Sequence, residues 1–136
     1  MIPVLSQPLA AAGFYVALSM LGLLILQARV IVMRRSKLIG IGDGNDRTLA
    51  LRIRVHANYA ENVPFVLVGL VSMAALGLPV LLVHLCGLLL LAGRTAHAIG
   101  LAGSAGKSSG RVVGMMLTNF ALIFTALAIL VKVLLP

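Results

Sequence analysis

Residues 62–92 read NVPFVLVGLVSMAALGLPVLLVHLCGLLLLA, a stretch without Asp, Glu, Lys or Arg. A helix needs roughly 20 apolar residues to cross a hydrocarbon core of about 30 Å, so this stretch is too long for one straight span. Gly77 and Pro79 divide it, because glycine and proline together favour a turn and end a helix. We therefore predict one membrane helix over about residues 48–76 and a second over about residues 80–101.

Two further apolar stretches flank this pair of helices. Residues 9–33 are apolar except near their end, where Gln27 and Arg29 stand, and residues 112–135 carry Lys132 near theirs. A cleaved signal peptide is the alternative for residues 9–33, but its positive charge would precede the apolar run, whereas here the charge follows it. The sequence thus predicts an all-α membrane protein, a four-transmembrane-helix bundle with up-down-up-down topology in a single domain over residues 1–136.

The whole chain has the composition of a membrane protein. Hydrophobic residues make up 61% of it and charged residues 10%, whereas soluble domains have roughly 45–50% and 25%. Its mean hydropathy is +1.13. A disulfide scaffold is excluded because Cys86 is the single cysteine, and a dinucleotide-binding domain is excluded because the spans leave no room for one. We expect membrane lipids as partners and no nucleic acid, since the basic residues lack accompanying aromatic side chains for stacking.

The basic residues are concentrated in the two connections at one end of the predicted bundle. Lys and Arg in short loops mark the cytoplasmic side of a membrane protein. By this rule both termini lie on the non-cytoplasmic side, and we expect an integral, multi-pass protein of a bacterial inner membrane. Lys132 is the lone basic residue predicted at the opposite end, whereas the connections at the basic end hold Arg34, Arg35, Lys37, Arg47, Arg52, Arg54, Lys107 and Arg111.

Several polar side chains stand inside the predicted spans, close to the basic end. A charge at mid-membrane costs about 2.5–3.5 kcal/mol on insertion scales, so such residues need a protein or water-lined surface. The second helix places three of them on one stripe, at positions i, i+4 and i+7, with its carboxylate roughly one turn inside the hydrocarbon. One carboxylate among three arginines leaves a surplus of positive charge, which indicates a basin for an anion. The alternative is that these residues only join helices or reach headgroups; they are Arg29, Arg54, Asn58, Glu61, Arg94 and His97.

Residues 54–64, RVHANYAENVP, fit the pattern R-x-H-x-N-x-x-E-x-x-P. This segment resembles the start of the second helix in the MAPEG family, the membrane-associated proteins in eicosanoid and glutathione metabolism. The family includes microsomal glutathione transferases, leukotriene C4 synthase and microsomal prostaglandin E synthase. GRTAH at residues 93–97 looks like the family's third-helix motif, Gln27-x-Arg29 fits the end of its first helix, and GIGDG at residues 40–44 is similar to a loop of its bacterial members.

The resemblance implies a homotrimer of four-helix protomers that binds glutathione between neighbouring subunits, near the cytoplasmic side. In the family, the Arg, Asn and Glu of the second helix hold the charged ends of the tripeptide. Glutathione offers two carboxylates and an ammonium, so arginine forks suit the former and a glutamate suits the latter. The binding residues that the resemblance implies are Arg29, Arg54, Asn58, Glu61, Arg94 and His97.

The thiol of glutathione must also lose its proton, and nearby guanidinium groups favour the thiolate. Arg111, near the start of the fourth helix, is the candidate for this catalytic role, and Ser108 is a possible hydroxyl donor at the same place. Leu101 stands where the third helix of the family has a tyrosine, and no tyrosine follows Tyr59. The activity implied is a glutathione-dependent transferase or peroxidase acting on a lipophilic small-molecule substrate that enters from the bilayer.

Two other functions fit the same residues. A non-catalytic membrane module would bind a fatty acid or anionic lipid in the same basic groove between subunits. A small multidrug-type transporter also has four helices and one membrane carboxylate, but its essential glutamate lies in the first helix, where this chain has none. No metal site is expected, because His56, His84 and His97 have no cysteine or carboxylate at the spacing of metal ligands.

Overall fold

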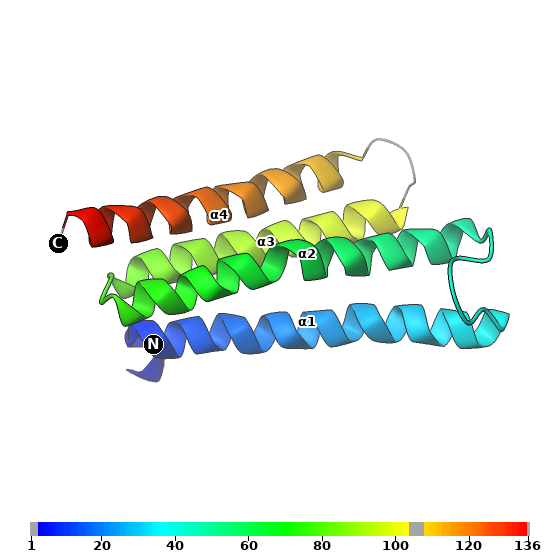
Figure 1. Ribbon diagram of the computed structural model, residues 1–136, viewed down its shortest axis with the longest axis horizontal. Helices are drawn as coiled ribbons and strands as arrows, with labels where there is room; N and C mark the ends of the chain where they lie inside the picture. Colours follow the sequence, from blue (N-terminus) through cyan, green and yellow to red (C-terminus); the bar gives the residue numbers. More distant parts are fainter. Residues whose placement is uncertain (1–2, 104–107, 136) are drawn as a thin grey trace.

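Four long helices, each antiparallel to the one before it, form the computed structural model of the chain, which describes residues 3–103 and 108–135 (Figure 1). The elements in chain order are η1 (Pro3–Ser6, a 3-10 helix), α1 (Pro8–Lys37), α2 (Arg47–Ala75), α3 (Val80–Gly103) and α4 (Ser109–Leu134). The described residues contain no strand. The predicted all-α bundle with up-down-up-down order is therefore confirmed.

The connection between α1 and α2 is held at both ends by electrostatics. α1 continues to Lys37, beyond the expected end at residue 33, because Arg34, Arg35 and Lys37 in its last turn stabilise the negative end of the helix dipole. Asp46 caps α2: its Oδ1 accepts a hydrogen bond from the Leu49 amide at 2.7 Å. The other carboxylate oxygen of Asp46 accepts from Lys37 Nζ at 2.5 Å. One side chain thus joins the two helix ends.

Protonation of Asp46 should loosen this connection. The Lys37 ammonium, and after it the Leu49 amide, lowers the pKa of Asp46 below its usual value. The contribution of Asp46 to stability is therefore complete above the ordinary Asp pKa of about 3.9 and is lost as the pH falls through the depressed pKa. Hydrogen exchange at the Leu49 amide, corrected for its intrinsic rate, should accelerate over that window. Asp46→Asn keeps a capping oxygen without the charge, so a pH profile in this variant identical to that of the wild type would contradict the assignment.

The long apolar stretch is divided at the turn that the sequence predicts. Gly77 has a φ of +72°, a left-handed conformation that glycine adopts without steric cost. The amide of Leu78 donates to the carbonyl of Met73 at 3.0 Å, which closes the end of α2. α3 then starts at Val80 and runs back along α2.

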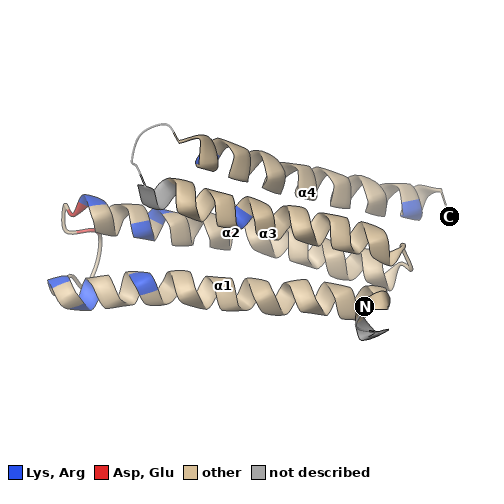
Figure 2. Ribbon diagram, turned by 180° about the vertical axis from the view of Figure 1, so that it is seen from behind, with Lys and Arg blue, Asp and Glu red and all other residues tan. Residues whose placement is uncertain are grey.

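Among the described helices, α1, α3 and α4 are long and apolar enough to cross a membrane. α2 has a similar length of 29 residues, but its first half carries Arg47, Arg52, Arg54 and Glu61, so its composition differs from that of the other three. It still lies alongside α1 and α3 through the body of the bundle (Figure 1). Figure 2 shows most basic residues gathered at the end where α1 and α2 are connected.

Glycines let α3 and α4 pack closely. A Cβ atom on Gly114 would lie 2.5 Å from the backbone nitrogen of His97 and 2.6 Å from the carbonyl oxygen of Gly93. A Cβ on Gly110 would lie 3.1 Å from the carbonyl oxygen of Ala96. Small residues four apart allow such approach between membrane helices. The polar residues of α3 are consequently held directly against α4.

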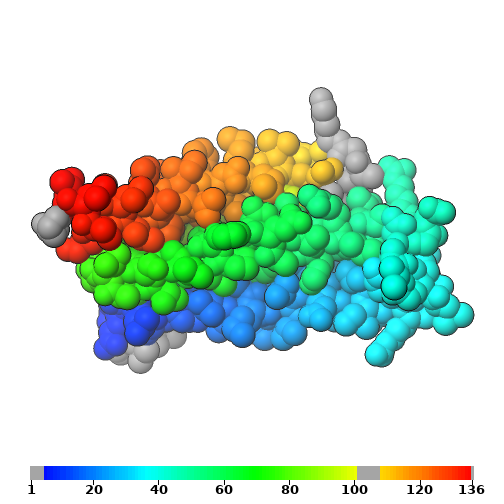
Figure 3. Space-filling view, in the orientation of Figure 1, coloured from blue at the N-terminus to red at the C-terminus, as the bar shows by residue number. Residues whose placement is uncertain are grey.

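The body is elongated (Figure 3), and many large apolar side chains are exposed on its surface. Large apolar side chains along α1 and α4 are about half exposed or more, among them Leu21 and Leu24 on α1 and Phe120 and Leu127 on α4. Exposed apolar surface of this extent is typical of contact with lipid or with another subunit. The bundle is thus an integral membrane protein with its charges confined chiefly to one end.

Candidate functional site

Arg94 lies at the centre of the polar residues between α2, α3 and α4. Its side chain is 3% exposed. Its Nε donates to Thr118 Oγ1 of α4 at 2.9 Å, and its Nη1 donates to Asn58 Oδ1 of α2 at 2.8 Å. Its Nη2 donates at 3.4 Å to the carbonyl oxygen of Gly114 and contacts the sulfur of Met115 at the same distance. One guanidinium group therefore bridges three helices.

The partners of Arg94 in the described part of the chain are all neutral. The sequence has three side-chain carboxylates. Asp43 and Asp46 belong to the connection before α2, and Glu61 pairs with Arg54. Burying a cation costs several kcal/mol when no anion offsets it. Arg94 is consequently a buried positive charge with no carboxylate partner among the described residues.

Arg54, Asn58 and Glu61 share one face of α2, as their spacing predicts. Arg54 Nη1 lies 3.7 Å from Glu61 Oε1, and the two side chains are 64% and 53% exposed. The distance exceeds that of a direct hydrogen bond, so both groups keep capacity for other partners. Asn58 stands between them and contacts Arg94. Arg54 and Glu61 thus point out of the single protomer, whereas Asn58 turns inward to Arg94.

His97 lies one turn after Arg94 and is 7% exposed. Its backbone packs on Gly114 of α4. The guanidinium groups of Arg94, Arg111 and Arg54 all act on it electrostatically. The structure thus brings residues from α2, α3 and the first turn of α4 into one strongly positive region.

Ser108 and Arg111 stand at the start of α4. Ser108 is the N-cap residue, and its carbonyl oxygen accepts from the Arg111 amide at 3.1 Å. A positive side chain in the first turn opposes the helix dipole, so Arg111 adds positive potential to a helix end that is already positive. The hydroxyl of Ser108 makes no capping hydrogen bond and lies where a Cβ on Gly100 would approach it to 2.8 Å.

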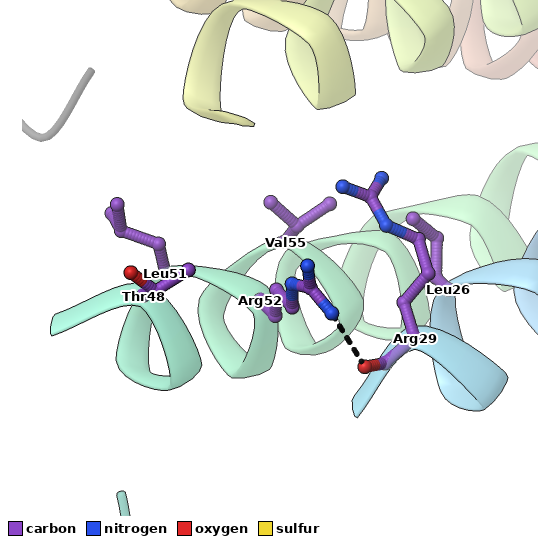
Figure 4. Close-up of a pocket in the computed structure, with 6 residues that line it drawn as sticks. All are labelled: Leu26, Arg29, Thr48, Leu51, Arg52 and Val55. Carbon is purple, nitrogen blue, oxygen red and sulfur yellow. Dashed lines mark hydrogen bonds between the residues drawn. The ribbon is translucent and has the colours of Figure 1, made fainter. Parts of the chain in front are cut away.

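Arg29 stands on α1, and its side chain extends from there toward Val55 of α2 (Figure 4). It lines a cavity of about 90 Å³ between the two helices, whose other lining residues include Leu26, Thr48 and Val55. Its carbonyl oxygen accepts from Arg52 Nη1 at 3.2 Å. In the described residues no hydrogen bond or ion pair joins Arg29 to the residues around Arg94. The convergence of Arg29 with them in one basin stays a prediction.

Sequence reasoning missed the α4 residues that bind Arg94. Thr118 accepts from Arg94 and donates its own hydroxyl to the carbonyl oxygen of Gly114 at 2.9 Å. Thr118 follows Gly114 by four residues and so lies on the same face of α4. That spacing was a usable signal, because the Gly110–Gly114 pair marks the face of α4 that packs on α3.

By its fold and its site, the protein is a helical membrane bundle. It carries a buried arginine between three helices and an outward arginine–glutamate pair on α2. The sequence model of the MAPEG family matches residues 12–131, and the chain belongs to this family. It is 35% identical over 89 residues to the inner membrane protein YecN of Escherichia coli K12, an alignment that covers 65% of this chain and 68% of YecN. The same values hold for YecN of Escherichia coli O6:H1. No solved structure matches the chain.

Proposed function

We propose that this MAPEG protein is a glutathione-dependent transferase or peroxidase of an inner membrane, which acts on lipophilic substrates through a thiolate. The observation that carries the proposal is Arg94, a guanidinium 3% exposed whose partners in the described chain are neutral. A carboxylate of the bound tripeptide supplies the missing negative charge. The inner-membrane location is consistent with the name of the YecN relative.

The outward pair on α2 suits the remaining charged groups of glutathione. Arg54 and Glu61 lie 3.7 Å apart and are more than half exposed. Arg54 offers a planar fork for the second carboxylate, and Glu61 accepts from the ammonium. Asn58 accepts a hydrogen bond from Arg94 at 2.8 Å. This contact fixes the position of the buried arginine relative to the pair on α2.

The surplus of positive charge also favours the thiolate. Glutathione with a neutral thiol carries one net negative charge, and loss of the thiol proton adds a second. Arg54, Arg94 and Arg111 together exceed Glu61 by two positive charges, so the site is balanced best by the thiolate form. Arg111 is the residue that we assign to the sulfur, with Ser108 as an additional hydroxyl donor.

We further propose that the site is completed in a homotrimer. A charged stripe at the level of the spans cannot be satisfied by lipid, and the α2 face with Arg54 and Glu61 points out of the protomer. A neighbouring subunit covers this face and supplies the other wall of the site. Arg29, which lines the cavity between α1 and α2 in its own protomer, is a candidate contribution to the site of the adjacent copy.

Thiolate formation tests the proposal directly. Mixing the purified trimer with glutathione in a stopped-flow spectrometer should give a rise in ultraviolet thiolate absorbance. Arg54→Ala and Glu61→Gln should each weaken glutathione binding about ten-fold or more, since a hydrogen bond to a charged group contributes about 1.5–3 kcal/mol. Isothermal titration measures that loss.

Arg35→Ala is the matched control, because Arg35 is an exposed arginine in the last turn of α1 and its loss should leave binding unchanged. Unaltered titration curves in both α2 variants would refute the proposal. A co-purified fatty acid or anionic lipid, together with no thiolate signal, would instead assign the same basin to a non-catalytic lipid-binding module.

A further inference from the structure

A groove lies at the other end of the bundle from the candidate site. It has a volume of about 510 Å³, within the range of about 300–1,000 Å³ that is usual for ligand pockets. The first half of α3 forms one wall, including Leu82 and Leu85, and the last half of α4 forms the other, including Leu127, Ala128 and Val131. Every side chain in its lining is apolar, apart from the thiol of Cys86.

A single basic residue stands at the edge of this groove. Lys132 is in the last turn of α4, four residues after Ala128 and next to Val131, which both line the groove, so it lies beside the groove at this end of the helix. Among the described residues it is the one Lys or Arg at this end, since residues 3–26 and 62–93 carry none. A long side chain at a helix end places its ammonium at headgroup level while its stem covers apolar surface.

We propose that the groove and Lys132 form a binding site for an anionic phospholipid of the leaflet opposite the basic connections. An acyl chain lies between α3 and α4, and the headgroup phosphate is held by the Lys132 ammonium. The charge argues for this occupant: an apolar groove alone accepts any lipid, whereas a cation beside it, on an end whose described residues include no other Lys or Arg, selects a negative headgroup. This site is independent of the glutathione proposal, because it shares no residue with it.

Native mass spectrometry of the intact protein, exchanged into vesicles of phosphatidylglycerol mixed with phosphatidylcholine, tests the proposal. The wild type should retain phosphatidylglycerol in preference to phosphatidylcholine. Lys132→Gln should reduce that preference about five-fold, the effect of one lysine near an anionic surface, while total lipid retention changes little. Ala128→Phe should fill the groove and reduce retention of both lipids.

Two controls separate the site from general membrane charge and general folding. Arg35→Gln removes a cation at the basic end, and its effect on the preference should be the same with and without Ala128→Phe, whereas the effect of Lys132→Gln should be lost once Ala128→Phe fills the groove. Leu130→Phe enlarges an exposed α4 side chain outside the groove and should leave the preference and the retention unchanged. An unchanged lipid preference in Lys132→Gln would overturn the proposal. It would also be overturned if Ala128→Phe retained its lipid but no longer associated with other subunits. The second outcome would assign the groove to another copy of the chain.

Discussion

Replacement of Arg94 by methionine should strongly weaken glutathione binding while leaving the free protein folded. The arginine makes its hydrogen bonds to neutral groups of α2 and α4 and has no carboxylate partner in the described chain. If its charge serves the ligand, removing it leaves a buried ligand carboxylate unpaired. Truncating one partner of such a pair costs about 2–5 kcal/mol, which is a loss of affinity of about thirty-fold or more. Isothermal titration with glutathione measures it.

The stability of the unliganded variant distinguishes this role from a structural one. Methionine fills the space of the aliphatic stem and removes the desolvation cost of a buried cation, which amounts to several kcal/mol. Against that gain, Asn58 Oδ1 loses its donor, at a cost of about 1–3 kcal/mol. Thr118 keeps the hydrogen bond to the Gly114 carbonyl. We therefore expect Arg94→Met without ligand to unfold at the same denaturant concentration as the wild type or at a higher one.

Arg94→Lys is the matched variant that keeps the charge. A single ammonium cannot reach Thr118, Asn58 and Gly114 at once as the guanidinium does, so glutathione should bind it more weakly than the wild type but more tightly than Arg94→Met. Wild-type affinity in Arg94→Met, or a loss of several kcal/mol in the stability of the unliganded protein, would show that Arg94 only joins the helices.

The helices could be predicted from the sequence because the patterns that indicate a helix are local. Uncharged stretches of about 20 residues and the Gly77–Pro79 interruption define the spans by length and hydropathy alone. The stripe of Arg54, Asn58 and Glu61 follows from the 3.6-residue period of a helix. The end of α1 was placed too early, at residue 33, because the cluster of basic residues was assigned to the connection although it suits the last turn of a helix.

The partners of each polar residue could not be predicted in the same way, because they depend on how the helices are rotated. Arg94 was expected in one basin with the polar stripe of α2, and it contacts Asn58 of that stripe, but its partner Thr118 on α4 was not predicted. Arg29 lines a cavity between α1 and α2, and its place in the same basin stays a prediction. These rotations are set by which small residues meet, and a single sequence gives candidate small-residue pairs on each helix without saying which pairs touch.

Gly114→Ala should be strongly destabilising, because α3 and α4 touch through backbone at this position. The added Cβ would lie 2.5 Å from the His97 nitrogen and 2.6 Å from the Gly93 carbonyl oxygen, and backbone atoms cannot move aside as a flexible side chain does. Overpacking a core costs about 1–3 kcal/mol, and more when the backbone must shift. We expect a cost of about 3 kcal/mol in the free energy of unfolding, measured by denaturant titration in detergent.

The same substitution at Gly13 provides the control, because it changes helix propensity without the clash. Gly13 lies inside α1, and a Cβ there meets no atom within 4 Å. Alanine should therefore stabilise α1 by about 0.5–1 kcal/mol, the usual gain over glycine in a helix interior. Gly114→Ala should also weaken glutathione binding, since separating α4 from α3 removes Thr118 from Arg94. Equal stabilities of the two alanine variants would mean that α3 and α4 are not in backbone contact at Gly114. That outcome would also contradict the position of Arg94 between α2, α3 and α4.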